Sequence, residues 1–292
     1  MLARAKINLY LHVAAPDARG YHPLQSLVAF ADIGDKVEFL TAKSVGSTDN
    51  LSPCLNIDGP FSAGLEANED NLVLKAVRAF EAAAGAKVDR HEIRLTKTLP
   101  VASGMGGGSA DAGAALRLLR QLYAPGMADA DLAEIAGAIG ADGVMCLWSQ
   151  SAFAEGYGEK LTPVTLPQMP AVLINPRVEC STAKVYGGYD VQGRFNEIDA
   201  MPGFSGVRNI RQLISALSHT RNDLQSPAIH LQPVIAEVLT MLEAQSETRF
   251  ARMSGSGATC FALCETDETA EVLGVRMQAM MPGAWVRACR LG

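Results

Sequence analysis

Long apolar runs are missing from this chain of 292 residues. None approaches the roughly 18 residues that a membrane-spanning helix needs, so the sequence predicts no membrane span. The chain also has no excess of basic over acidic residues. The net charge is −6 and the pI is about 5.4, so no overall positive field would attract nucleic acid. Hydrophobic residues make up 48% of the chain, which is ample for a core, and the length suggests two domains or one large one.

Metal-binding cysteine patterns are also missing. The six cysteines form no CxxC pair and show no cysteine–histidine spacing typical of zinc ligands. Cys260 and Cys264 are an even number of residues apart in the apolar run TCFALC, so a strand would place both on one face as buried free thiols. Unpaired thiols indicate a reducing compartment, and we expect a cytoplasmic protein.

The two most familiar phosphate-binding motifs do not occur, although one stretch is rich in glycine. Residues 100–113 read PVASGMGGGSADAG. No Gly-Lys-Ser/Thr follows, which excludes a Walker loop, and Ser109 stands where the dinucleotide fingerprint needs its third glycine. Alternation before the glycines and an apolar stripe after them predict a strand and a helix. A glycine turn that opens a helix exposes backbone N–H groups, so this loop is predicted to hold phosphates; a flexible connector is the alternative.

The rest of the chain alternates strand and helix patterns without an internal repeat. We expect two strands within 24–40, broken at IGD, and further strands at 5–13, 144–148, 151–156, 170–176, 252–264 and 284–290. We expect helices at 68–85, 129–140, 208–218, 231–245 and 267–280. Asp70 or Asn71 should cap the first of these helices, and Gly85 should end it. Gly140 is expected to end the next one in a left-handed conformation. Residues 187–207 are predicted to form a mobile loop.

Residues that could act on a phosphoryl group come from separate parts of the chain. Asp142 follows a predicted helix end, where the helix dipole disfavours a carboxylate. A carboxylate at such a place usually points to solvent or has a cation nearby. Lys6 and Asn8 alternate with apolar residues of the first strand, and a second glycine–serine turn, SGSGAT, occupies 254–259. Each also has a plain structural explanation, Lys6 as a solvated strand residue and the turn as a tight entry into a strand.

These pieces resemble one kinase superfamily. The segments AKINLYLHV, DARGYHPLQSLV, DNLVLKA, LPVASGMGGGSADA, IGAD, AFAEGYGE, NDL and RMSGSGATCF, in this order, resemble the superfamily of galactokinase, homoserine kinase, mevalonate kinase and phosphomevalonate kinase. AKINL and GYHPLQS are similar to the branch that phosphorylates a cytidine-diphosphate-linked methylerythritol. The resemblance covers nearly the whole chain. It implies an α+β, two-domain kinase fold, with a ribosomal-S5-domain-2-like half at 1–162, a ferredoxin-like α+β half at 163–292, and an active site in the cleft between them.

The resemblance also implies a role for each site residue. ATP would phosphorylate the 2-hydroxyl of the substrate by in-line transfer, in isoprenoid precursor synthesis by the non-mevalonate pathway. Asp142 would be the general base and Lys6 the adjacent cation. The phosphate loop would comprise Pro100, Val101, Ala102, Ser103, Gly104, Met105, Gly106, Gly107, Gly108, Ser109 and Ala110, and the substrate side Asn8, Tyr21, His22, Thr182 and Tyr186. Mg²⁺ would accompany ATP, with Ser109 orienting a phosphate or the ion, and no metal site is expected on the protein itself.

The chain departs from the family pattern at several positions. Gly143-Val144 replaces the usual Val-Pro after Asp142, and Gly113 replaces an alanine inside a helix, which costs about 1 kcal/mol of helix preference. Three alternatives stay open: another branch such as homoserine or mevalonate kinase, a ligand-binding regulator without catalysis, and an RNA-binding protein of the S5-like fold. The acidic balance disfavours the last. The expected partners are therefore ATP and a small-molecule substrate, with neither nucleic acid nor membrane, and the expected state is a monomer or weak homodimer.

Overall fold

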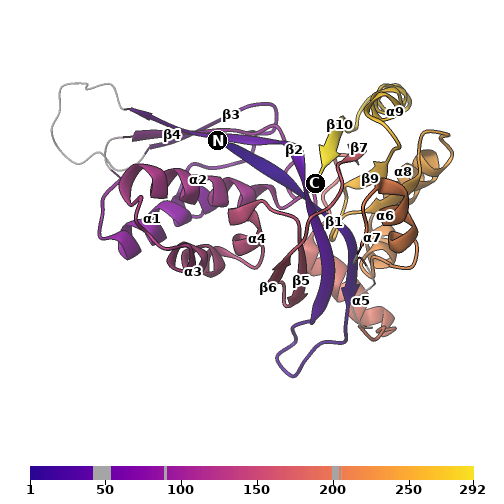
Figure 1. The fold of residues 1–292 in the computed structure, drawn as a ribbon, viewed down its shortest axis with the longest axis horizontal. Helices are drawn as coiled ribbons and strands as arrows, with labels where there is room; N and C mark the ends of the chain where they lie inside the picture. Colours follow the sequence, from indigo (N-terminus) through magenta and orange to yellow (C-terminus); the bar gives the residue numbers. More distant parts are fainter. Residues whose placement is uncertain (42–53, 89–90, 199–203, 205) are drawn as a thin grey trace. The chain divides into compact units, whose positions relative to one another are not determined.

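The computed structural model describes residues 1–41, 54–88, 91–198, 204 and 206–292. The chain packs as two compact units, each built from segments that are not consecutive. Unit 1 comprises Met1–Ala5, Ile33–Val101 and Gly106–Ser149, and unit 2 comprises Lys6–Asp32, Ala102–Met105 and Gln150–Gly292. Both units combine helices with strands (Figure 1), as the α+β prediction requires. Within the described ranges, no helix is long and apolar enough to cross a membrane.

Two long strands, β1 (Leu2–Val13) and β2 (Leu24–Thr41), pair with each other and contribute residues to both units. In unit 1, β2 pairs antiparallel with β4 (His91–Thr96), and β3 (Cys54–Asp58) pairs parallel with β4. The expected break of 24–40 into two strands is wrong, because β2 continues through Gly34. A Cβ atom on Gly34 would lie 2.0 Å from the carbonyl oxygen of Ala3, so this glycine permits the close approach of β1 instead of a turn.

The helices of unit 1 are α1 (Leu72–Ala84), α2 (Gly107–Tyr123), α3 (Asp129–Ile139) and α4 (Gly143–Trp148). Helices α1 and α2 pack against each other and lie along the same face of β3 and β4 (Figure 1). The Asn71 side chain accepts a hydrogen bond from the Val73 N–H at 3.0 Å, and Gly85 has a φ of 61°, so both predicted caps of α1 are confirmed.

Two expectations about unit 1 are wrong. The apolar run at 144–148 forms α4 instead of a strand, and α4 packs against α2 and α3. Five apolar residues satisfy either geometry, so the tertiary packing decided between them. Gly140 has a φ of 174°, which is extended and not left-handed, since the chain turns directly from α3 toward α4.

Unit 2 contains two groups of strands. The first part of β2 pairs with β5 (Ala152–Gly156), which pairs with β6 (Lys160–Pro163). The strands β7 (Met169–Asn175), β8 (Phe250–Met253), β9 (Cys260–Leu263) and β10 (Trp285–Leu291) lie in the antiparallel order β10–β7–β9–β8. Helix α9 (Asp267–Met280) connects β9 to β10 and packs on β10 and β7. This order is that of a split βαβ motif, which confirms the ferredoxin-like prediction.

The remaining helices of unit 2 are α5 (Thr182–Gln192), α6 (Ile210–Leu217), α7 (Gln225–Leu231) and α8 (Val234–Glu243). The predicted loop at 187–207 is wrong for its first residues, which belong to α5, and residues 199–203 and 205 lie outside the described part. Two buried side chains, Val185 and Tyr189, hold α5 against the core despite its two glycines. The predicted helix at 231–245 begins later, at Val234, and α7 was not expected. The predicted free, buried state of Cys260 and Cys264 is confirmed.

Gly113 offers a test of close helix packing in unit 1. A Cβ atom there would lie 2.7 Å from the carbonyl oxygen of Cys146 in α4. We expect Gly113→Ala to lower the free energy of unfolding by about 1–3 kcal/mol, because overpacking outweighs the gain in helix propensity.

Chemical denaturation of the two proteins measures this difference. Gly137→Ala is the matched control. Gly137 is an exposed glycine inside α3, and its added Cβ would meet only the Val144 side chain, at 3.6 Å. This control should be neutral or more stable by up to about 1 kcal/mol. Equal gains in stability from both substitutions would contradict the packing argument.

Candidate active site

The first strand carries Lys6 and Asn8, and both side chains are buried. Their exposed fractions are 6% and 7%, so the explanation of Lys6 as a solvated strand residue is wrong. The Lys6 N–H donates to the carbonyl oxygen of Met105 at 2.9 Å, which pins β1 to the glycine-rich loop. The Asn8 side chain donates to Ser26 Oγ at 2.8 Å. Two of the predicted site residues therefore lie directly beside part of the predicted phosphate loop.

The SGSGAT turn holds the same part of the loop. Ser254 Oγ accepts the Asn8 N–H at 3.0 Å and donates to the Gly104 carbonyl at 3.2 Å. A Cβ atom on Gly104 would lie 2.7 Å from the carbonyl oxygens of both Ser254 and Gly257. Glycine at 104, which has a φ of 74°, is therefore required both for its backbone conformation and for this close approach. The turn is more than a tight entry into β9, because it fixes the loop.

The second part of the loop opens α2 in unit 1, as predicted. Gly106 caps the helix with a φ of 63°, and Gly107, Gly108 and Ser109 form its first turn. Gly108 is exposed, and the other three residues are half-buried. The first N–H groups of a helix have no partner within the helix, and its positive dipole end favours an anion. This geometry can receive phosphate oxygens.

The remaining loop residues divide by burial. Pro100, Ser103, Met105 and Ala110 are buried, while Val101 and Ala102 are exposed. Ala102 has a φ of 50°, a left-handed conformation that few non-glycine residues adopt. Buried side chains on both sides of the glycines anchor the loop while its middle part faces outward.

Asp142 lies at the N-terminal end of α4 in unit 1. We expected the unfavourable C-terminal end of a helix. Asp142 does follow the end of α3 at Ile139, but it also stands at the start of α4, whose backbone dipole favours a carboxylate there. The side chain is half-buried. A Cβ atom on Gly143 would lie 1.8 Å from the Ala136 carbonyl oxygen, so the departure from Val-Pro gives α4 a close contact with α3. Lys6 and Asp142 belong to different units, and their joint role stays a prediction.

On the substrate side, the structure brings His22 and Tyr186 together in unit 2. Their ring centroids are 5.2 Å apart. His22 is buried, with Nδ1 2.8 Å from the Ala14 carbonyl oxygen and Nε2 3.1 Å from a carboxylate oxygen of Asp190. Thr182 Oγ1 lies 2.8 Å from Ser256 Oγ of the SGSGAT turn. Tyr21 is 64% exposed, and its ring lies edge-on to that of Tyr157, with the centroids 6.2 Å apart.

A buried charge cluster beneath the start of α2 was missed by the sequence reasoning. Lys97 Nζ donates to the carboxylates of Asp35 and Asp111, the latter at 2.7 Å, and all three residues are buried. Burial, followed by the nearby Asp35 carboxylate, raises the pKa of Asp111 to about 7. The two carboxylates outweigh the opposing effect of burial and raise the pKa of Lys97. Asp35 and Lys97 are 62 residues apart, so no spacing rule could have found the pair.

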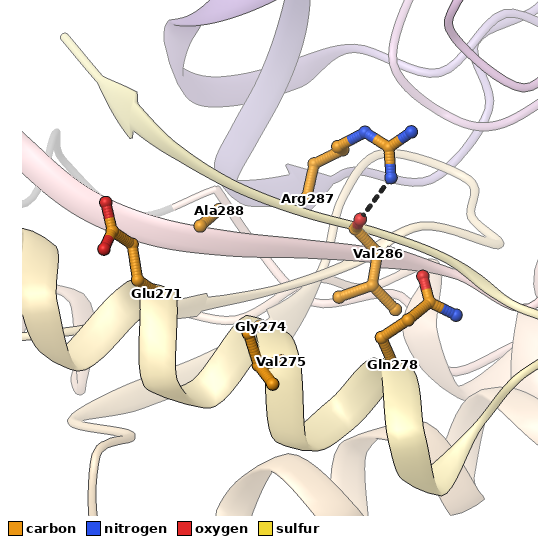
Figure 2. A pocket seen from close by; sticks show the side chains of 7 residues that line it. All are labelled: Glu271, Gly274, Val275, Gln278, Val286, Arg287 and Ala288. Atoms are coloured by element: carbon orange, nitrogen blue, oxygen red, sulfur yellow. Dashed lines mark hydrogen bonds between the residues drawn. The ribbon is translucent and has the colours of Figure 1, made fainter.

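A surface pocket of about 510 Å³ lies elsewhere in unit 2, between α9 and β10 (Figure 2). Apolar side chains of Val275, Val286 and Ala288 contribute to its lining, and none of the predicted site residues does. Among the described residues, no group of three or more His, Cys, Asp and Glu side chains could hold a metal ion. The candidate site is therefore defined by the loop contacts and not by this pocket.

The raised pKa of Asp111 predicts how folding stability depends on pH. Its folded-state pKa lies above the unfolded value, so folding stability from this group is present at low pH and is lost as the pH rises from about 4 to 7. We expect Asp111→Asn to remove this contribution, up to about 1.4 kcal/mol per pH unit in that window. Urea denaturation of both proteins at pH 4.5–8 measures the slopes. Parallel slopes would contradict the raised pKa.

Two models of known protein families match segments of this chain. The model of the GHMP kinases N terminal domain matches residues 71–154, and that of the GHMP kinases C terminal domain matches residues 200–283. These matches leave residues 155–199 unassigned, so the boundary at 162/163 stays a prediction. A crystal structure of homoserine kinase from Cytophaga hutchinsonii is 21% identical, with a TM-score of 0.68 over 99% of this chain and 95% of that one, and shows the fold alone.

Two relatives named 4-diphosphocytidyl-2-C-methyl-D-erythritol kinase are more similar. The one from Caulobacter sp. strain K31 is 47% identical over 99% of this chain and 97% of its own, and that from Hyphomonas neptunium is 45% identical over 99% and 95%. A crystal structure of 4-(cytidine 5'-diphospho)-2C-methyl-D-erythritol kinase is 30% identical, with a TM-score of 0.76 over 100% of this chain and 98% of that one. The chain therefore belongs to the GHMP kinases and, within them, to the family of 4-diphosphocytidyl-2-C-methyl-D-erythritol kinases.

Proposed function

We propose that the chain phosphorylates the 2-hydroxyl of 4-diphosphocytidyl-2-C-methyl-D-erythritol with ATP, in isoprenoid precursor synthesis by the non-mevalonate pathway. The observation that carries this proposal is the 47% identity, over almost the full length of both chains, to a relative of that name. The buried His22 beside Tyr186 supports a pyrimidine base as part of the substrate, since an aromatic ring can stack on a base.

The loop at 100–110 is the proposed binding site for the ATP phosphates. The N–H groups at the start of α2 supply hydrogen bonds and a favourable dipole, and the contacts of Gly104 and Met105 keep the loop in one conformation. Mg²⁺ is commonly held by substrate phosphates, waters and one or two carboxylates, so it does not need a protein cluster of its own. When bound with ATP, it would neutralise phosphate charge. Ser109, in the first turn of α2, would orient a phosphate or the ion.

Asp142 and Lys6 are the proposed catalytic residues. Phosphoryl transfer asks mainly for in-line positioning and for stabilisation of charge on the transferred group. The Asp142 carboxylate would accept the proton of the acceptor hydroxyl. The Lys6 ammonium would stabilise both that carboxylate and the charge on the phosphoryl oxygens, and Asn8 would contact the acceptor or position Lys6. This assignment combines the family resemblance with the burial of Lys6 and the half-burial of Asp142.

The decisive assay measures ADP release by the purified chain with ATP, Mg²⁺ and one acceptor at a time. We expect turnover with 4-diphosphocytidyl-2-C-methyl-D-erythritol and little with homoserine, mevalonate or simpler polyols. Turnover with homoserine or mevalonate alone would favour another branch of the superfamily. Binding of ATP without turnover on any acceptor would favour a regulator, and RNA binding that competes with ATP would favour the remaining alternative.

Asp142→Asn is expected to lower kcat by about 10²–10⁴-fold, the usual contribution of general-base catalysis, and to leave the fold intact. Steady-state kinetics and thermal unfolding measure the two effects. Asp131→Asn is the control, because Asp131 is an exposed aspartate in the first turn of α3 and has no proposed role. Near-normal turnover of Asp142→Asn would refute the assignment.

Lys6→Ala should cause a loss of similar size. If the lysine and the carboxylate act as one unit, the double variant Lys6→Ala/Asp142→Asn will lose little more activity than either single variant. The four kcat/KM values of this cycle give the coupling free energy directly. Losses that simply multiply would mean that the two residues act independently.

A further inference from the structure

A turn in unit 2 is tied to a distant hairpin by the Asp17 carboxylate. Its oxygens accept the N–H groups of Arg19 and Tyr21 at 2.8 and 3.0 Å, and also the Arg19 Nε–H at 3.0 Å. The Tyr157 hydroxyl donates to the same carboxylate at 2.8 Å. Tyr157 follows β5 and lies 140 residues from Asp17 in the sequence. The segment AFAEGYGE thus has a contact that the kinase site described above does not use.

The aromatic rings reinforce this tie. The Arg19 guanidinium lies 5.7 Å from the centroid of the Tyr21 ring and 5.1 Å from that of Tyr157. The two rings are 6.2 Å apart in an edge-on arrangement. Tyr21 is nevertheless 64% exposed, so this network, and not a hydrophobic core, sets the orientation of its ring. An exposed ring held in this way offers a face on which a planar group can stack.

The family resemblance assigns Tyr21, like His22, to the pocket for the cytidine end of the substrate, so the planar group is a pyrimidine base. The next residue, His22, is buried and packs against Tyr186, the ring pair that the proposed function assigns to the cytidine end of the substrate. Hydrogen bonds, first from the Tyr157 hydroxyl and then from the Tyr21 N–H, hold the pKa of the Asp17 carboxyl well below its usual range. The carboxylate therefore stays charged at neutral pH, and the network does not depend on a titration.

We propose that Tyr157, acting through Asp17 and Arg19, is a positioning residue that holds the Tyr21 ring as a platform for the pyrimidine base of the substrate. This inference rests on the proposed function and assigns specificity for the nucleoside end to residues from two distant segments. An exposed ion pair between Arg19 and Asp17 contributes little by itself. The hydroxyl of Tyr157 makes the hydrogen bond that links the turn to the hairpin, and it is the group to remove.

Tyr157→Phe removes only this hydroxyl. We expect the KM for 4-diphosphocytidyl-2-C-methyl-D-erythritol, and the inhibition constant of free CDP against it, to rise together by about 3- to 10-fold, since one exposed hydrogen bond contributes on this scale. The kcat, the KM for ATP and the midpoint of thermal unfolding should stay unchanged. Tyr123→Phe is the control, because it removes a tyrosine hydroxyl that contacts His91 in unit 1.

Other outcomes overturn the inference. Unchanged KM and CDP inhibition in Tyr157→Phe would refute the platform while leaving the proposed function intact. A fall in kcat, or a rise in the KM for ATP, would indicate a general structural role instead. Arg19→Gln gives a second test, because the double variant should be no worse than the single ones if both residues act through Tyr21. Failure of the wild-type chain to turn over the substrate would refute the proposed function and, with it, this inference.

Discussion

The candidate site depends most on one buried hydroxyl, Ser254 Oγ. It accepts the N–H of Asn8 in β1 and donates to the carbonyl of Gly104 in the glycine-rich loop. A buried N–H or C=O group without a partner costs about 1–3 kcal/mol. Ser254 supplies a partner to a backbone group in β1 and to one in the loop, so both segments depend on this serine. The backbone hydrogen bond from Lys6 to Met105 repeats the connection one residue further along the loop. Strand, loop and turn therefore form one interlocked structure within unit 2.

The loop is also fixed on its other side, within unit 1. An oxygen of the buried Asp35 carboxylate accepts the N–H groups of Thr98 and Leu99, immediately before the loop begins. Asp35 also accepts a hydrogen bond from the ammonium of Lys97, so a charge cluster holds the residues that lead into the loop, and Ser254 holds Gly104 within it. A phosphate site made of backbone N–H groups needs such support, because backbone groups bind strongly only when they do not have to reorganise around the ligand.

Locally encoded features could be predicted from the sequence. Asn71 and Gly85 bound α1 through contacts within a few residues, and the strand, glycine loop and helix follow from patterns in one short window. The ferredoxin-like half and the assignment of His22 and Tyr186 to the substrate side came from the family resemblance, since neither depends on a spacing rule. The sequence could not tell that 144–148 forms a helix, because packing against α2 and α3 decides this. The buried cluster around Lys97 and the contact of Tyr157 with Asp17 join residues that are far apart in the chain.

The glycines show why a composition-based argument was incomplete. Glycine in a sequence indicates flexibility or a turn, and at Gly106 its left-handed φ does open a helix. At Gly34, Gly113 and Gly143, however, the neighbouring atoms that a Cβ would meet are backbone atoms of another segment. At these three positions the absence of a side chain makes the structure tighter. The close packing of α3 against α4 therefore requires the glycine of Gly143-Val144, which replaces Val-Pro after Asp142. This contact restricts the backbone at the start of α4, as the ring of a proline would do in the usual sequence.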